Sequence, residues 1–229
     1  MQQPERHSLG QRLSMFVQRL CVKYDFISLN SVRGKTNRIQ NFYDYLAPVY
    51  DYIWPSSDSF QKAAKHVAET YVNPGDRVLD LGAGTGLVSL NILDKALSVI
   101  GYDLHFKMLQ QAKSKALKTS RSATVPTAGV SFCQGNATNL PFANESFDIV
   151  VSAFMMVYLD PQQKVDALAD ASRVLCPAGK IVILTSQGEL HPRYTTREEW
   201  CEIAARAGLG TPEFNDFNEI YRTIVISRD

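Results

Sequence analysis

From residue 77 onward, short apolar runs alternate with stretches of helical periodicity, and this alternation restricts the possible folds more than any other feature of the chain. Predicted strands lie at residues 77–81, 97–103, 130–134, 147–153 and 180–185. Predicted helices lie at residues 85–96, 105–117, 162–175 and 196–207. Such alternation is typical of βαβ units around a parallel sheet that is covered on both faces. We therefore expect a doubly wound α/β fold, with two late strands at 214–217 and 221–227 pairing antiparallel.

The 229 residues are enough for one domain with a short extension. We place an N-terminal helical extension at residues 1–37 and the main domain at residues 38–229. Apolar residues within 9–24 recur at helical spacing, which predicts a helix that packs on the main domain. A lid over the substrate, a membrane-surface helix that makes peripheral contact, and an organelle-targeting segment are alternatives that the sequence leaves open.

Charge and cysteine usage exclude several classes of function. The net charge of +1 gives no reason to expect a nucleic-acid partner, although residues 1–40 carry seven Lys or Arg against two acids. The four cysteines are widely spaced and form no CxxC pair, so neither a metal site nor a disulfide framework is expected. No run of about 18 apolar residues predicts a membrane span, and no compact apolar stretch predicts a secretory signal. We expect a cytoplasmic protein.

A glycine-rich loop follows the first predicted strand. The sequence Val78-Leu79-Asp80-Leu81-Gly82-Ala83-Gly84-Thr85-Gly86 leads from that strand into a helix. Glycines allow a sharp turn and a close approach of a ligand to the backbone. Asp103 ends the next strand, where its carboxylate can accept hydrogen bonds from the two hydroxyls of a ribose. The two elements together predict a site for an adenosine-like ligand.

Details of this loop favour one ligand over another. A dinucleotide loop reads GxGxxG or GxGxxA, whereas this one reads GxGxG, and Leu87 occupies the place of the third small residue. The Asp80 carboxylate would repel a pyrophosphate but suits a ligand with a positive ammonium group. S-adenosylmethionine has an ammonium group, a sulfonium and a ribose diol and lacks phosphate. The loop therefore favours S-adenosylmethionine over NAD as the cofactor, with S-adenosylhomocysteine as its product.

Several segments in order resemble the class I S-adenosylmethionine-dependent methyltransferases over roughly residues 38–185. The glycine loop is similar to their first motif, and Tyr102-Asp103-Leu104 with Met108-Leu109 is similar to the second. Gly135-Asn136-Ala137 with Leu140-Pro141-Phe142 resembles their segment G-D-A-x-x-L-P-F. Residues 174–180 resemble their turn L-x-P-G-G. The resemblance implies a Rossmann-like seven-stranded sheet of order 3-2-1-4-5-7-6 with an antiparallel seventh strand. The cofactor-binding residues expected from the loop and the resemblance are Tyr43, Tyr50, Asp80, Gly82, Ala83, Gly84, Gly86, Asp103, Leu104, Met108, Asn136, Ala137, Ser152, Ala153 and Phe154.

Two positions depart from the family pattern. Asn136 stands where the family has an Asp beside the adenine amino group, and its amide oxygen can still accept that hydrogen bond. Ala178 replaces the first turn glycine, which we expect to be tolerated if φ is negative at this position. Neither departure argues against activity.

The acceptor side of the site is less defined. Residues 38–52 resemble a segment of quinone-biosynthesis C-methyltransferases that helps to close the cofactor pocket, which implies Tyr43 and Tyr50; aromatic packing is the alternative. Residues 153–158 follow the fourth strand and either line an apolar acceptor pocket or pack in the core. For acceptors that must lose a proton, His191 and Tyr158 are the catalytic candidates, with Glu189 as another.

These features predict a methyltransferase acting on a small, apolar or aromatic molecule as a monomer or homodimer. The short stretch after the fifth strand leaves no room for a recognition domain, and the sequence has no motif typical of nucleic-acid amino-group methylation. An enzyme acting on RNA or protein, and a noncatalytic subunit that binds S-adenosylmethionine, are the alternatives. A nicotinamide-dependent oxidoreductase is opposed by Asp80 and Leu87.

Overall fold

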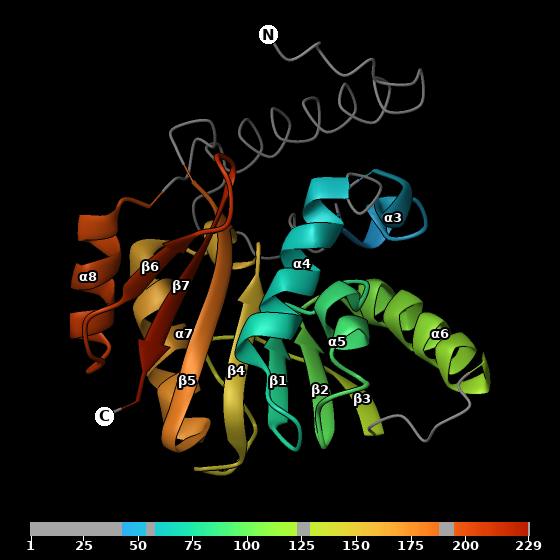
Figure 1. Ribbon diagram of the computed structural model, residues 1–229, viewed down its shortest axis with the longest axis horizontal. Coiled ribbons are helices and arrows are strands. Elements are labelled where there is room, and N and C mark those ends of the chain that lie inside the picture. The colour runs from blue at the N-terminus through green and yellow to red at the C-terminus, as the bar shows by residue number, and fades with distance from the viewer. Residues whose placement is uncertain (1–42, 54–57, 123–128, 188–194, 229) are drawn as a thin grey trace, which may run out of the picture.

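The computed structural model describes residues 43–53, 58–122, 129–187 and 195–228 and contains a seven-stranded sheet (Figure 1). The strands are β1 (Arg77–Leu81), β2 (Ser98–Asp103), β3 (Gly129–Gln134), β4 (Phe147–Ala153), β5 (Leu175–Ser186), β6 (Glu213–Asp216) and β7 (Tyr221–Ser227). Their order is β3-β2-β1-β4-β5-β7-β6. Strand β7 pairs antiparallel with β5 and β6, and the other pairs are parallel. The expected sheet order and the antiparallel seventh strand are confirmed.

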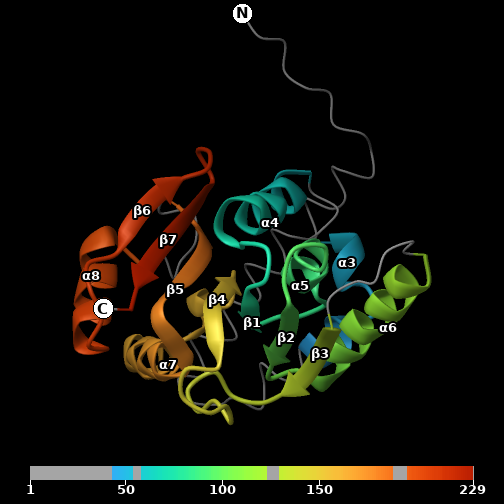
Figure 2. The same cartoon turned by 60° about the horizontal axis from the view of Figure 1, so that its bottom comes forward.

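Helices cover both faces of the sheet (Figures 1 and 2). They are α3 (Tyr50–Ile53), α4 (Asp58–Tyr71), α5 (Leu87–Asn91), α6 (Phe106–Ser122), α7 (Pro161–Val174) and α8 (Arg197–Arg206). Helices α4, α5 and α6 lie on one face, and α7 and α8 lie on the other. Within the described residues, no helix has the length and apolar character needed to cross a bilayer.

Two apolar cores follow from the alternation of side chains along the strands. In β1, Val78 belongs to the core beneath α4 and α5, whereas Leu79 and Leu81 belong to the core beneath α7 and α8. The first core is completed from α4 by Ala63, Ala64, Val67 and Ala68, which recur at helical spacing. Both faces of β1 are thus buried, which explains why its sequence is nearly continuously apolar. Among the buried residues 78–81 the one polar side chain is Asp80, and it lies at the site described below.

Helix α5 is shorter than the predicted helix at 85–96. It ends at Asn91, and residues 92–95 form turns that are tied to the loop before β1. The backbone N–H of Gly75 donates to the Lys95 carbonyl, and the Lys95 ammonium donates to two carbonyls near the end of α4. These contacts are made between segments distant in sequence, so helical periodicity alone could not reveal them.

The condition under which we expect Ala178 to be tolerated, a negative φ, is not met, since its φ is 63°. Residues 175–180 belong to β5, and the pairing register with β4 shifts between Phe147 and Ile149. Between these paired positions β5 has more residues than β4, and one of them, Ala178, adopts a left-handed backbone conformation. Such a conformation costs an alanine about 1–2 kcal/mol. The neighbouring Gly179 is confined as well, because a Cβ there would lie 2.9 Å from the Cys176 carbonyl oxygen.

Candidate functional site

The glycine loop after β1 adopts a backbone that explains its composition. The φ angles of Gly82, Gly84 and Gly86 are 81°, 52° and 82°, all in the left-handed region. The N–H groups of Gly82 and Ala83 both donate to the Tyr102 carbonyl, at 2.7 and 3.2 Å, which attaches the loop to the end of β2. A Cβ on Gly82 would lie 2.4 Å from Cβ of Met155. Gly82 therefore allows the segment after β4 to contact the loop directly.

Asp103 lies beside this loop at the carboxyl end of β2. It is 8% exposed, and its two carboxylate oxygens accept hydrogen bonds from the backbone of different segments. Oδ2 accepts from the Gly84 N–H at 2.8 Å, and Oδ1 accepts from the His105 N–H at 2.7 Å. Burial raises the pKa of the Asp103 carboxyl, and these hydrogen bonds oppose that rise. Each carboxylate oxygen can still accept another hydrogen bond, as a ribose diol requires.

Asp80 is placed beneath the loop rather than on its outer side. It is 1% exposed, and its Oδ2 accepts from both the backbone N–H and the hydroxyl of Ser89, at 2.9 and 2.6 Å. Burial raises the pKa of Asp80 to about 6, and the negative charge of Asp103 adds to the rise. The hydrogen bonds from Ser89 act in the opposite direction. Asp80 is thus a carboxyl group whose charge changes close to neutral pH.

Residues 43–53, here called the cap segment, close over the loop. The Tyr43 hydroxyl donates to the Tyr158 hydroxyl at 2.5 Å, and the Tyr43 ring centroid lies 5.1 Å from that of His105. Tyr43 is buried with Leu46, Ala47 and Met108, while Tyr50 packs at the edge of this cluster. The structure thus brings together Tyr43, Tyr50, Met108 and Tyr158, which the sequence singles out separately.

Asp51 fixes the cap segment in a way that the sequence reasoning missed. Its Oδ1 accepts from the Thr85 hydroxyl within the glycine loop at 2.6 Å, and its Oδ2 pairs with the Lys115 ammonium at 2.7 Å. One carboxylate therefore joins α3, the loop and α6. The signal was present, since Asp51 follows Tyr50 in the segment that resembles quinone-biosynthesis enzymes. Its partners are distant in sequence, so only the fold shows them.

The end of β4 carries a strained aromatic residue. Phe154 has a φ of 58°, which is uncommon for a bulky side chain. Its ring stacks on that of Phe60 from α4, with centroids 4.4 Å apart, and meets Tyr221 of β7 edge-on at 5.3 Å. Ser152, two residues earlier, is fully buried, and its hydroxyl has no hydrogen-bond partner among the described residues. Phe60 and Tyr221 were not among the predicted site residues.

The remaining predicted site residues lie on the loops after β2 and β3 or outside the described residues. Asn136 is exposed, and its amide oxygen accepts from the Thr138 N–H at 3.1 Å within its own loop. Leu104 and Ala137 are partly buried on the loops after β2 and β3. His191, Glu189, the segment 9–24 and the whole extension 1–37 lie outside the described residues.

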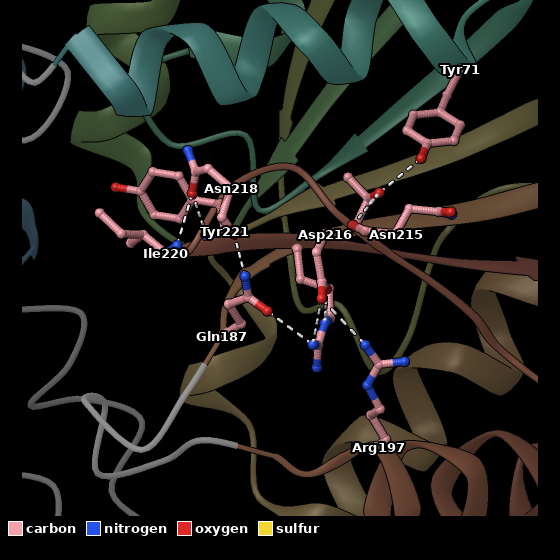
Figure 3. Close-up of polar contacts among 10 residues, drawn as sticks. Tyr71, Gln187, Arg197, Asn215, Asp216, Asn218, Ile220 and Tyr221 are labelled. Carbon is pink, nitrogen blue, oxygen red and sulfur yellow. Dashed lines mark hydrogen bonds and ion pairs between the residues drawn. The ribbon is translucent and has the colours of Figure 1, made fainter.

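A polar network organises the sheet edge where β5 ends (Figure 3). Arg222, which is 7% exposed, donates to Asp216 at 2.5 Å and to the Gln187 side-chain carbonyl at 2.9 Å. Gln187 in turn donates to the Asn218 backbone carbonyl. Arg222 holds the pKa of Asp216 below its ordinary value. The network connects the β6–β7 turn to the residue after β5, at the same edge of the sheet as the glycine loop.

Comparisons with known proteins agree with this geometry. Residues 78–179 match the family model described as "Methyltransferase domain". The chain is 37% identical over 110 residues to a demethylmenaquinone methyltransferase of Renibacterium salmoninarum, covering 48% of this chain and 41% of that one. It is 28% identical over 171 residues to a 2-phytyl-1,4-naphtoquinone methyltransferase of Trichormus variabilis, covering 72% of each chain. Among solved structures, the cyclase SpnF has a TM-score of 0.68 at 17% identity, covering 86% of this chain and 97% of that one.

These likenesses differ in what they establish. The chain spans about two fifths of the length of the Renibacterium relative and nearly three quarters of that of the Trichormus relative. The structural likeness is at low sequence identity and therefore supports the fold alone.

Proposed function

We propose that this protein methylates a small aromatic acceptor, because residues 78–179 match the family model described as a methyltransferase domain and the sheet has the strand order of the class I S-adenosylmethionine-dependent methyltransferases. The observation that carries the proposal is the pairing of Asp103 with the glycine loop at the carboxyl ends of β1 and β2. The residues there match the chemistry of S-adenosylmethionine. Asp103 suits its ribose hydroxyls, and the anionic form of Asp80 suits its ammonium group.

The residues that would hold the cofactor fall into three groups. The first is the backbone of Gly82, Ala83, Gly84 and Gly86, with Asp80 beneath it. The second is Asp103, with Leu104 and Met108 beside the adenine. The third consists of Tyr43 and Tyr50 from the cap segment, Asn136 and Ala137 after β3, and Ser152, Ala153 and Phe154 at the end of β4. The bound cofactor would supply an electrophilic methyl group on a sulfonium.

The protein's own contribution would be to position the acceptor and to exclude water. The acceptor is proposed to lie at the carboxyl end of β4, where Phe154, Phe60 and Tyr221 present aromatic rings. An aromatic acceptor suits such a wall, and the relatives named above are a demethylmenaquinone methyltransferase and a 2-phytyl-1,4-naphtoquinone methyltransferase. Where the acceptor must lose a proton, the Tyr158 hydroxyl, held by Tyr43, and His191 are the proposed bases.

Further features remain part of the proposal. We expect a cytoplasmic enzyme that is a monomer or homodimer and has no nucleic-acid partner. The helix within residues 9–24 is expected to pack on the main domain, with peripheral membrane contact as an alternative. Methylation of RNA or protein would contradict the proposed acceptor class. Cofactor binding without turnover would contradict the proposed enzymatic activity.

The proposal is tested in two steps. Calorimetric titration with S-adenosylhomocysteine, with NAD as the control ligand, should show binding of the former only. Labelled S-adenosylmethionine should then transfer its methyl group to a short-chain demethylmenaquinone, offered in quinone and quinol forms, and not to RNA. Absence of S-adenosylhomocysteine binding, or a preference for NAD, would remove the central claim. Binding without transfer to any aromatic acceptor would instead favour the noncatalytic alternative.

Cofactor affinity should depend on pH through Asp80. Because its pKa is about 6, Asp80 loses its charge as the pH falls through 6, and its attraction for an ammonium group is then lost. The dissociation constant of S-adenosylhomocysteine should rise below pH 6 in the wild type. In Asp80→Asn it should be about tenfold or more higher at pH 7.5, because a hydrogen bond to a charged group is worth roughly 1.5–3 kcal/mol. Calorimetry across pH 5–8 measures both effects.

The same substitution should stabilise the ligand-free protein. The pKa of Asp80 rises from 3.8 to about 6 on folding, so this carboxyl stabilises the fold most below pH 4. That contribution is lost as the pH rises through 6 and amounts to ~3 kcal/mol. Asp80→Asn should therefore unfold at a higher temperature than the wild type at pH 7.5, with a smaller advantage at pH 4.5. Tighter ligand binding in the variant, or lower stability at pH 7.5, would contradict this role.

Asp51 should control how long the cofactor stays bound. Asp51→Asn weakens the contacts that hold the cap segment to Thr85 and Lys115, so S-adenosylhomocysteine should dissociate several-fold faster. The effect should be moderate because both partners of the ion pair are about one third exposed. Stopped-flow dissociation gives the rate, and the exposed Asp94→Asn is the matched control. Equal rates in all three proteins would show that the Asp51 contacts do not retain the ligand.

A further inference from the structure

The chain after β3 forms a compact turn whose shape is fixed by its own hydrogen bonds. The Asn139 N–H donates to the Asn136 carbonyl at 3.0 Å, and the Thr138 N–H donates to the Asn136 side-chain oxygen at 3.1 Å. The second bond orients the Asn136 amide, because its oxygen and not its NH2 group must face the Thr138 N–H. Asn136 is exposed, so its position depends on how the whole turn is attached to the protein. We call residues 135–140 the β3 loop.

One end of the β3 loop is attached to the residue proposed to bind the ribose. The Gly135 N–H donates to the backbone carbonyl of Asp103 at 2.9 Å. Gly135 also lies directly against Tyr102, since a Cβ at this position would be 1.8 Å from the Tyr102 hydroxyl oxygen. Tyr102 is buried in the core beneath α7 and α8. The first residue of the loop is therefore fixed with respect to Asp103.

The other end of the β3 loop is attached to α7 through Leu140. The Leu140 N–H donates to Oδ2 of Asp170, and the Leu140 carbonyl accepts from Nη2 of Arg173 at 2.9 Å. Nε of Arg173 donates to Oδ1 of Asp170 at 2.6 Å, which joins the two side chains. Nη1 of Arg173 donates to the Phe142 carbonyl at 2.8 Å and to the Asn144 side-chain oxygen at 3.0 Å. Both backbone polar groups of Leu140 are thus bonded to side chains of α7.

This attachment has a geometric effect beyond its contribution to stability. The Leu140 side chain is buried in the core, but the side chains of Arg173 and Asp170 are 36% and 18% exposed. An ion pair with this exposure contributes modestly to the free energy of unfolding. Its hydrogen bonds to Leu140 nevertheless determine where the backbone lies as it leaves the β3 loop.

We propose that Asp170 and Arg173 are positioning residues for adenine recognition. They act through Leu140 and hold the β3 loop so that Asn136 faces the adenine of a cofactor whose ribose is bound by Asp103. Neither of the two α7 side chains contacts the ligand itself. Their role is that of a supporting shell, which keeps a binding group in the orientation that recognition requires. The inference rests on the proposed function, because it requires an adenosine-containing cofactor at the end of β2.

The measurable consequence is discrimination between purine bases. The Asn136 side-chain oxygen, oriented by Thr138, can accept a further hydrogen bond from the adenine amino group. S-inosylhomocysteine carries a carbonyl oxygen in place of that amino group, and two acceptors cannot bond to one another. The wild type should therefore bind S-inosylhomocysteine about tenfold more weakly than S-adenosylhomocysteine, which is the loss expected for one hydrogen bond.

Calorimetric titration of the full chain with both ligands tests the proposal. Arg173→Met keeps an unbranched apolar side chain but removes the guanidinium group, which releases the Leu140 carbonyl. The preference for S-adenosylhomocysteine should fall from about tenfold to about twofold or less, because the hydrogen bond to the base is lost. Arg173→Lys should retain part of the preference, since an ammonium group can still donate to one of the carbonyls.

Asp170→Ala is a second variant that releases the other polar group of Leu140. It removes the acceptor of the Leu140 N–H, and alanine is well tolerated within a helix such as α7. We expect the same fall in the preference for S-adenosylhomocysteine. This variant keeps the proposal testable even where Arg173→Met does not fold.

Arg77 offers a matched control at the end of β1 opposite the glycine loop. Its Nε and Nη2 donate to Asp148 at 3.0 and 2.9 Å, and the two side chains are 39% and 36% exposed. Arg77→Met therefore removes an ion pair of comparable exposure that lies away from the β3 loop. Thermal unfolding of the ligand-free proteins compares their stabilities. The preference between the two ligands should stay at the wild-type value in Arg77→Met.

The possible outcomes separate this inference from the proposed function. An unchanged preference in Arg173→Met and Asp170→Ala, or an equal loss in Arg77→Met, would overturn it, because the ion pair would then serve stability alone. Equal binding of the two ligands by the wild type would overturn it as well, since the β3 loop would then not recognise the base. In both cases S-adenosylhomocysteine still binds and the proposed function stands. A wild type that binds no S-adenosylhomocysteine would instead remove the proposed function, and this inference with it.

Discussion

Replacing Asp103 by alanine should reduce the affinity for S-adenosylhomocysteine by about a hundredfold or more. The expected loss combines the hydrogen bonds to two ribose hydroxyls, each roughly 1.5–3 kcal/mol because the acceptor is charged. It also releases the N–H groups of Gly84 and His105, whose shared acceptor holds the loop in position. Calorimetry at pH 7.5 measures the dissociation constant, and Asp94→Ala is a surface control.

The stability of the Asp103→Ala protein must be followed in parallel. Removal of a buried carboxylate can disturb the fold, so the thermal unfolding of each ligand-free variant should be recorded. Asp103→Asn separates the two effects, because its amide oxygen can still accept from one backbone N–H but carries no charge. We expect Asp103→Asn to fold as the wild type does and to bind the ligand with intermediate affinity. An unchanged affinity in Asp103→Ala would show that this carboxylate does not face the ribose.

Gly82→Ala should lower the free energy of unfolding by about 3 kcal/mol or more. A positive φ costs alanine roughly 1–2 kcal/mol, and overpacking adds about 1–3 kcal/mol. The second contribution arises because the new Cβ would lie 2.4 Å from Cβ of Met155. Urea unfolding followed by circular dichroism measures the change.

Gly75 offers a matched control for that substitution. Its φ is 91°, but a Cβ there would meet nothing within 4 Å. Gly75→Ala should therefore cost only the backbone contribution, and the difference between the two variants isolates the contact with Met155. Equal destabilisation by both substitutions would contradict a tight contact at Gly82.

Much of the sheet could be predicted from the sequence. The predicted strands at 77–81, 147–153 and 221–227 have the same bounds as β1, β4 and β7, because these buried strands are largely apolar. The strand order came from the resemblance of the motifs, since periodicity carries no information about which strands are neighbours. The placement of Asp103 beside the glycine loop follows from that order.

Contacts between distant segments could not be predicted in this way. Asp51 meets Thr85 and Lys115 only because the cap segment crosses the loop. The left-handed backbone of Phe154 and Ala178 conflicts with their local preferences and is imposed by packing and strand register. The local sequence indicates only which backbone conformation each residue prefers. At these positions the tertiary structure overrides that preference.

The position of β7 between β5 and β6 has a consequence for how the chain completes its fold during synthesis. Strand β6 is made before β7, yet it joins the sheet only through β7. A nascent chain that has emerged as far as β6 therefore has five strands ready to pair and a sixth without a neighbour. The Arg222 network cannot form either, because its central residue lies in β7. The last assembly step thus waits for residues 221–227, and until then the open edge of β5 is exposed to other chains.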